Sequence, residues 1–231
     1  MRKIVIFILL FSLFVFTGSA LADGHTMMEK LSLTGGLSYN TFAVVITENG
    51  TDVTDSSFGM FFGSEGPAVK EAVKSGMGFF IGGIYPLNEM LGIEFGYDSA
   101  TGSYDGPIDI GEGTEPGEFD NAMSGIYAGV NYKLNKNFNV KGLLTSYNLT
   151  GEGKLDSEDE ATVLWKANGI GALVGGEFMY MLQENANLVV NLAYRYAVLD
   201  VTEGADGEPA PEGIEFDGSG IRLGVGVNLA F

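Results

Sequence analysis

The chain has 231 residues and contains no cysteine, one histidine and one tryptophan. Without cysteine it has no disulfide framework, no thiol chemistry and no cysteine to carry a lipid anchor. Beyond the first 22 residues, no stretch reaches the roughly 18 consecutive apolar residues that indicate a transmembrane helix. The sequence therefore excludes a disulfide-rich scaffold, a lipoprotein and a helical membrane protein.

Basic residues are also scarce. There are 12 lysines and arginines against 30 acidic residues, and the formal net charge is −18. A chain this acidic repels phosphate backbones, which excludes nucleic acid as a partner. An acidic composition can also indicate disorder, but 45% hydrophobic residues, 12% aromatic residues and 35 glycines argue against disorder. Abundant glycine with few prolines favours a domain of many strands.

The N-terminal segment has the layout of a secretory signal peptide. Arg2 and Lys3 precede an apolar run over residues 4–16, and small residues follow up to Ala22. The alternative is a membrane anchor, but the run is shorter than the roughly 20 residues that a span needs. We predict that residues 1–22 are cleaved and that residues 23–231 form one domain.

Apolar residues alternate with small or polar residues along most of the remaining chain, which predicts β-strands. In residues 221–231 every odd position is apolar. Leu87, Leu134, Leu182 and Leu229 recur about 47 residues apart, as hairpins of an up-and-down meander would. We expect eight strands, at residues 30–40, 76–87, 91–100, 122–134, 138–148, 164–182, 187–199 and 219–231.

The connections between these strands are alternately short and long. The long connections span residues 41–75, 99–121, 149–163 and 200–218, and they hold most of the acidic residues. Because alternate connections lie at the same end of a meander, one end of the molecule is expected to be strongly anionic. Neither "DSEDE" nor "DGEPAPEGIEFDG" has the ligand spacing of a calcium loop. We therefore expect no metal site and no cofactor, only diffuse screening by divalent cations.

The composition of the two strand faces indicates which face is inside. A soluble barrel such as a lipocalin carries its charged residues outside, but here the polar face is mostly Gly, Ala, Ser and Asn. Small residues suit the crowded lumen of an eight-stranded barrel, so the apolar face should meet lipid. Aromatic residues near both ends of the apolar face predict two interfacial belts. The belt residues are Tyr39, Tyr85, Tyr97, Tyr132, Phe138, Phe178, Tyr180, Tyr194 and Tyr196.

A signal peptide, eight alternating strands, long polar loops and a terminal Phe resemble the small bacterial outer-membrane barrels of the OmpA transmembrane-domain, OmpX and OmpW type. The resemblance implies an all-β fold, an eight-stranded antiparallel up-and-down transmembrane β-barrel with short periplasmic turns and long extracellular loops. It also implies a monomer in the bacterial outer membrane, surrounded by lipid and lipopolysaccharide. The barrel-assembly machinery would recognise Gly226, Leu229 and Phe231, although Gly224 stands where the family has a polar residue.

Charged residues on the polar face are candidates for a lumen network: Glu94, Asp98, Lys133, Lys141, Glu177, Arg195 and Arg222. A turn centred near residue 185 would place Glu177 diagonally opposite Arg195. Because buried charges must be paired or hydrated, the network is expected to plug and rigidify the barrel. The alternative is a gated ion path.

The first long loop carries its own signals. Asn49-Gly50 predicts a hairpin, Pro67 and Gly76 predict the start and stop of a short helix, and residues 51–62 are not expected to form a ninth membrane strand. The loop is also rich in apolar residues. Phe42, Val44, Ile46, Phe58, Phe61 and Phe62 form either a loop core or an apolar mouth for hydrophobic solutes.

Catalysis has little support. Lipid-modifying enzymes of this architecture commonly use a histidine base near the outer rim, whereas His25 lies close to the predicted mature N-terminus. We expect a non-enzymatic barrel with a structural or surface-interaction role and a largely plugged lumen. The alternative function is a narrow channel for small hydrophobic solutes, and an outer-leaflet lipid enzyme comes third.

Overall fold

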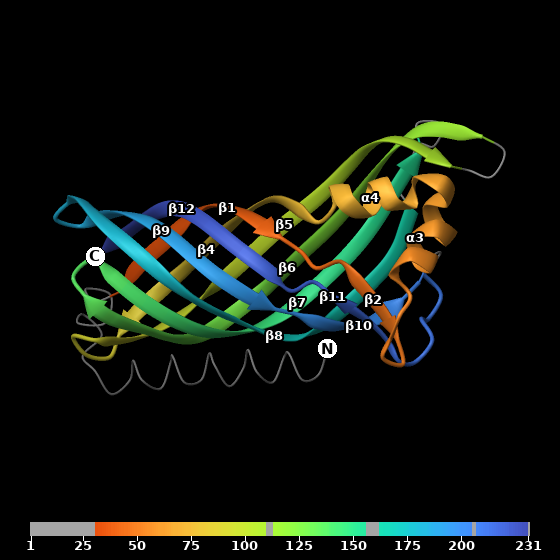
Figure 1. Cartoon of the computed structure of the whole chain (residues 1–231). Coiled ribbons are helices and arrows are strands. Elements are labelled where there is room, and N and C mark those ends of the chain that lie inside the picture. The colour runs from red at the N-terminus through yellow and green to blue at the C-terminus, as the bar shows by residue number, and fades with distance from the viewer. Residues whose placement is uncertain (1–30, 110–112, 156–161, 205–206, 231) are drawn as a thin grey trace.

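The computed structural model describes residues 31–109, 113–155, 162–204 and 207–230. Within these ranges, eight strands pair antiparallel with their neighbours in a closed ring (Figure 1). They are β1 (Ser32–Thr41), β4 (Ser75–Pro86), β5 (Leu91–Asp109), β6 (Thr114–Asn135), β7 (Phe138–Leu155), β8 (Thr162–Gln183), β9 (Ala186–Tyr196) and β12 (Gly220–Ala230). The predicted all-β fold with eight antiparallel strands is confirmed. The signal peptide, His25 and Phe231 lie outside the described residues.

The ring closes where β1 meets β12, with Leu33 opposite Leu229. Gly36 and Gly226 face each other at this seam. A Cβ atom at Gly36 would lie 2.2 Å from the carbonyl oxygen of Val225, so the two backbones approach as only glycine permits. The close approach of β1 and β12 at the seam therefore depends on small residues in both strands.

Short turns at residues 87–90, 136–137 and 184–185 define one end of the barrel, here called the turn end, and the opposite end is called the loop end (Figure 1). From the turn end to beyond mid-length, the outer face is apolar. Leu37, Leu144 and Ile170 are 65%, 63% and 76% exposed. The same stretch of lumen holds buried polar side chains, among them Asn131 and Asn191. This arrangement is the inside-out pattern of a membrane barrel.

Four strands continue far into the segments that the sequence predicts to be loops. β5 runs to Asp109, β6 begins at Thr114, β7 ends at Leu155 and β8 begins at Thr162. In these extensions the alternation is inverted. The lumen side carries Phe119, Met123, Leu149 and Trp165, all buried, whereas Glu118, Asp120 and Glu152 lie exposed outside. The predicted connections at residues 99–121 and 149–163 are therefore too long, because the strands extend into them. The sequence misled because acidic and glycine residues on a solvated outer face have the composition of a loop.

Three of the other four strands, β1, β9 and β12, break at one level and then continue. Residues 42–44 separate β1 from β2 (Val45–Glu48), and residue 197 separates β9 from β10 (Val198–Glu203). Residues 218–219 separate β11 (Ile214–Asp217) from β12. The register is unchanged across each break: Tyr39 faces Leu223 and, beyond the break, Ile46 faces Phe216. The breaks are joined to one another, since Ala43 N–H donates to the Ser219 carbonyl at 2.7 Å.

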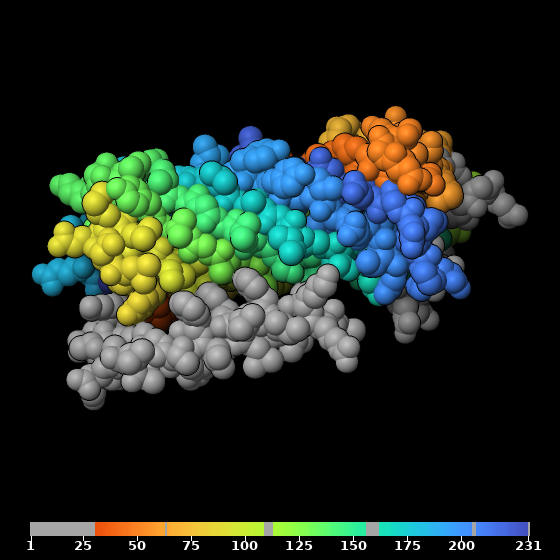
Figure 2. Space-filling model, turned by 90° about the horizontal axis from the view of Figure 1, so that it is seen from below, coloured from red at the N-terminus to blue at the C-terminus, as the bar shows by residue number. Residues whose placement is uncertain are grey.

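The first long segment fills the gap that remains between β2 and β5. Asn49 and Gly50 both have positive φ, as a type I′ turn requires, and connect β2 to the two-residue β3 (Thr51–Asp52). Two helices follow, α3 (Thr54–Phe62) and α4 (Gly66–Ala72), linked by the 3-10 turn η1 (Gly63–Glu65). The hairpin and the helix that begins near Pro67 are confirmed, whereas the predicted stop at Gly76 is wrong because α4 ends at Ala72 and Gly76 lies in β4. Helix α3 was not predicted. Figure 2 shows this orange segment beside the blue residues near 200–217.

Neither α3 nor α4, the two α-helices in the described part of the chain, is long and apolar enough to cross a membrane.

Candidate functional site

Two groups of buried charges occupy the lumen. The one nearer the turn end, here called the lower ion cluster, consists of Glu94, Lys141 and Glu177. Lys141 Nζ lies 2.8 Å from Glu94 Oε1 and 3.1 Å from Glu177 Oε2, and the three side chains are at most 1% exposed. The Asn131 amide donates to Glu94 Oε2 at 2.8 Å. Strands β5, β7 and β8 are thus cross-linked through the lumen.

The upper ion cluster consists of Asp98, Arg195 and Arg222. Arg195 Nη2 lies 3.2 Å from Asp98 Oδ2, and Arg222 Nη1 lies 3.1 Å from Asp98 Oδ1. The second contact is an ion pair by distance but lacks hydrogen-bond geometry. Arg195 also donates to Asn40 Oδ1 at 2.7 Å, and Arg222 lies over the ring of Phe80 at 5.1 Å. One carboxylate therefore holds two guanidinium groups in the middle of the barrel.

The structure corrects two details of the expected network. Lys133 is exposed beside a short turn and belongs to neither cluster. Glu177 faces Asn191 across the β8–β9 pair, whereas Arg195 faces Leu173, so the expected diagonal contact between Glu177 and Arg195 is wrong. Arg195 lies four residues along β9 from the residue opposite Glu177, which is too far for a diagonal contact. Glu177 instead pairs with Lys141, and Arg195 pairs with Asp98.

Above the upper ion cluster, apolar side chains fill the loop end. We call this group the apolar plug, and it comprises Phe42, Val44, Ile46, Phe58, Phe62, Phe119, Trp165 and Phe216, each at most 7% exposed. Phe58 contacts Trp165 with ring centroids 5.6 Å apart, and Phe62 contacts Phe119 at 4.9 Å. Phe61 is only partly buried. The residues considered for an apolar mouth thus form, with strand residues, the core of the loop end.

The plug is fastened to the wall at the start of α3. Ile46 N–H donates to Thr54 Oγ1 at 2.9 Å, and the Thr54 hydroxyl and backbone N–H donate to Asp52 Oδ1 at 2.6 and 2.9 Å. These two donors lower the pKa of Asp52 below its usual value. Val44 has φ +51°, which is strained for a β-branched residue, yet it is buried in the plug. Packing of the plug therefore stabilises an unfavourable backbone.

The proposed belt residues all lie on the outer face. Tyr132, Phe178 and Tyr180 are exposed near the turn end, and Tyr39, Tyr194 and Tyr196 are exposed nearer the loop end. Tyr85, Tyr97 and Phe138 are half-buried by neighbours on the same face, such as Phe79 beside Tyr97 at 5.8 Å. Gly226 and Leu229 lie on β12 at the turn end. The described ranges contain no group of three His, Cys, Asp or Glu residues that could hold a metal ion.

Comparison with solved structures identifies the architecture. The outer membrane protein OprG from Pseudomonas aeruginosa matches with a TM-score of 0.51 and 14% identity, over 87% of this chain and 95% of that one. The chain has the fold of the small outer-membrane barrels. Ail, the attachment invasion locus protein of Yersinia pestis, matches with a TM-score of 0.49 and 14% identity, over 86% and 97% of the two chains. No family model matches the sequence of this barrel, and no curated protein matches it either.

Proposed function

We propose that this barrel resides in the bacterial outer membrane, with its short turns in the periplasm and its loop end outside, and serves a structural or surface-interacting role. The observation that carries the proposal is the closed lumen. Two ion clusters cross-link the strands, and the apolar plug fills the loop end above them. These clusters support the proposal because a lumen filled by buried side chains should conduct ions poorly. The strand extensions meanwhile present a large surface at the loop end.

The surface that projects from the membrane is acidic. Exposed carboxylates such as Glu118, Asp120 and Glu152 line the outside of the β6–β7 extension. Lipopolysaccharide phosphates are also anionic, so diffuse divalent cations are the expected bridge between the two. Assembly through Gly226, Leu229 and Phe231 as a monomer remains part of the proposal.

A liposome flux assay tests the closed lumen. We expect the reconstituted barrel to pass neither K⁺ nor a small hydrophobic solute, and the Phe58→Ser/Phe62→Ser variant to pass K⁺, because the plug then hydrates. Heat-modifiable migration on gels verifies that both proteins are folded. A wild-type flux equal to that of the folded double variant would overturn the proposal.

A second test uses Glu177→Ala, which removes one carboxylate from the lower ion cluster. We expect this variant to unfold at a lower temperature while its K⁺ flux stays close to that of the wild type. A large increase in flux with unchanged thermal stability would contradict the proposal.

The alternative function is a narrow channel for small hydrophobic solutes. An apolar cleft beside α3 favours it, since this cleft reaches Trp165 in the plug. The alternative predicts uptake of a hydrophobic solute that is lost when the cleft is filled, for example by Ile214→Trp.

An outer-leaflet lipid enzyme is the third candidate, and lipid analysis before and after incubation with the barrel tests it. We expect no change in the lipids.

A further inference from the structure

A cleft of about 370 Å³ opens at the loop end, between α3 and the segment that connects β10 to β11. Its floor includes Trp165 and Phe216, which belong to the apolar plug, and its sides include Met60, Phe61 and Pro211. The volume lies at the lower end of the range of about 300–1,000 Å³ that is typical of small-molecule sites. Met60 is 74% exposed at the cleft and offers an apolar contact surface to a ligand there.

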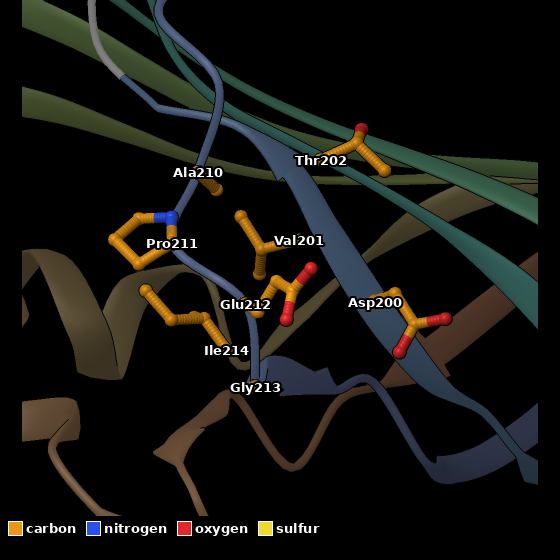
Figure 3. Close-up of a pocket in the computed structure, with 8 residues that line it drawn as sticks. All are labelled: Asp200, Val201, Thr202, Ala210, Pro211, Glu212, Gly213 and Ile214. Atoms are coloured by element: carbon orange, nitrogen blue, oxygen red, sulfur yellow. The ribbon is translucent and has the colours of Figure 1, made fainter.

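A second hollow of about 330 Å³ adjoins the first and shares Val201, Ala210, Pro211 and Ile214 with it. Figure 3 shows Ala210 and Pro211 on one side of this hollow, Asp200 and Thr202 on the other, and the Glu212 carboxylate between them. The first hollow is therefore mainly apolar, and the second, which shares four lining residues with it, carries two carboxylates.

Three carboxylates around these hollows have no ion-pair partner among the described residues. Glu208 lines the first hollow, and Asp200 and Glu212 line the second. None of the three forms an ion pair with a cation of the described ranges. Lys166, at the nearby β8–β10 pair, is already paired with Glu203 at 2.6 Å. The local field is thus negative beside an aromatic and methionine-lined cleft.

We propose that the two hollows form one binding site for an amphipathic cation, a molecule with a short alkyl or aryl body and an ammonium group. The apolar body occupies the cleft against Trp165, Phe61 and Met60, where burial of apolar surface provides the affinity. The ammonium group lies among Asp200, Glu208 and Glu212, whose negative charges attract it. This binding activity goes beyond the structural role and requires no open lumen.

Trp165 is the one tryptophan of the chain, so indole fluorescence reports on a single position, where the cleft meets the apolar plug. The probe is decyltrimethylammonium with a bromine at the end of its alkyl chain, because bromine quenches indole fluorescence on contact. It is titrated into the full barrel in nanodiscs of phosphatidylcholine. We expect saturable quenching by this probe, and about tenfold weaker quenching by the bromine-labelled decanol and decyl sulfate.

Variants separate the two halves of the site. Asp200→Asn/Glu208→Gln/Glu212→Gln should weaken the cation about tenfold, which corresponds to modest contributions from three partly solvated charges. Met60→Ser should weaken the binding of the cation and of the alcohol alike, because it removes apolar contact without adding a charge. The matched control, Glu118→Gln/Asp120→Asn/Glu152→Gln, removes the same charge from the exposed face of the β6–β7 extension and should leave the affinity unchanged.

Three outcomes would overturn the proposal. Equal quenching by the alcohol would make the cleft merely apolar, and equal weakening by the control variant would make the attraction diffuse. Non-saturable quenching in every variant would place the probe in lipid rather than in the cleft. Each of these results is independent of whether the lumen conducts.

Discussion

Lys141 and Asp98 show what a buried charge does inside a narrow barrel. Lys141 lies between two carboxylates, and Asp98 lies between two guanidinium groups. Replacing a whole buried ion cluster with apolar residues is often neutral, whereas removing one partner leaves an uncompensated charge. The clusters therefore contribute less to net stability than to fixing which strands face each other across the lumen.

Lys141→Met should lower the free energy of unfolding by about 3–5 kcal/mol, because Glu94 and Glu177 would remain buried without their cation. Urea unfolding in lipid vesicles measures the loss. Lys133→Met is the matched control, since Lys133 is exposed at a turn, and it should change stability by less than about 0.5 kcal/mol. Equal losses in the two variants would contradict the role of the cluster.

Asp52 is expected to make the start of α3 sensitive to acid. Its folded-state pKa lies below the ordinary value of 3.8 because Thr54 donates two hydrogen bonds to the carboxylate. The stabilisation is therefore complete above pH 3.8 and is lost as the pH falls through the lower folded-state pKa. Hydrogen exchange at residues 54–58 measures this loss. Asp52→Asn should remove the pH dependence, and an unchanged dependence would assign it to another group.

At the scale of elements, the membrane strands followed from the sequence, whereas their extensions and α3 did not. Alternation identified the strands because one face must meet lipid along their length. Beyond the membrane the apolar residues change sides, as with Phe119 and Met123 between Glu118 and Asp120. Apolar and polar residues also alternate in the strand extensions, but their many acidic residues led to the prediction of loops. The lumen charges were found in the same way, and only the strand register could assign their partners.

Helix α3 was missed for a different reason. Its sequence, TDSSFGMFF, has a central glycine and few strong helix formers. The helix forms because Phe58 and Phe62, one turn apart, both become buried in the apolar plug. Tertiary packing here outweighs local preference, and the pair of aromatic residues at i and i+4 was the signal that could have revealed it.

Phe58→Ala should destabilise the plug by about 3–5 kcal/mol, since a buried ring is lost from a packed cluster. The emission of Trp165, whose ring lies 5.6 Å from Phe58, should shift to longer wavelength as water enters. Met60→Ala is the control on the same helix, where an exposed side chain is removed, and its emission should stay close to that of the wild type. A similar shift in both variants would mean that Phe58 does not seal the plug.

At the scale of the whole molecule, a single wall of strands meets two solvents. From the turn end upward the wall is apolar outside and polar inside, as in a membrane barrel. At the loop end it is apolar inside and acidic outside, as in a soluble barrel. The level at which the pattern inverts is also the level at which β1, β9 and β12 break. Two features therefore mark the same level of the wall: the inversion of side-chain polarity and the breaks in the backbone of three strands.

The orientation of the molecule can be tested because the chain has no cysteine. Met60→Cys, at the loop end, should react with a membrane-impermeant maleimide on intact cells. Glu89→Cys, in a short turn, should react only after the outer membrane is permeabilised. Both positions are exposed, so accessibility within the fold does not distinguish them. The reverse labelling pattern would place the acidic extensions in the periplasm.

The unchanged register across the strand breaks also limits how such a sequence can diverge. Because β2, β11 and β10 remain in line with β1, β12 and β9, one residue inserted within β11 would turn its side chains over relative to two neighbours at once. Insertions or deletions should then be tolerated at hairpin tips such as Asn49-Gly50. An insertion or deletion within one of the breaks would require matching changes in the neighbouring strands to restore the pairing register. We therefore expect the loop end to diverge together with the barrel rather than as a separate part.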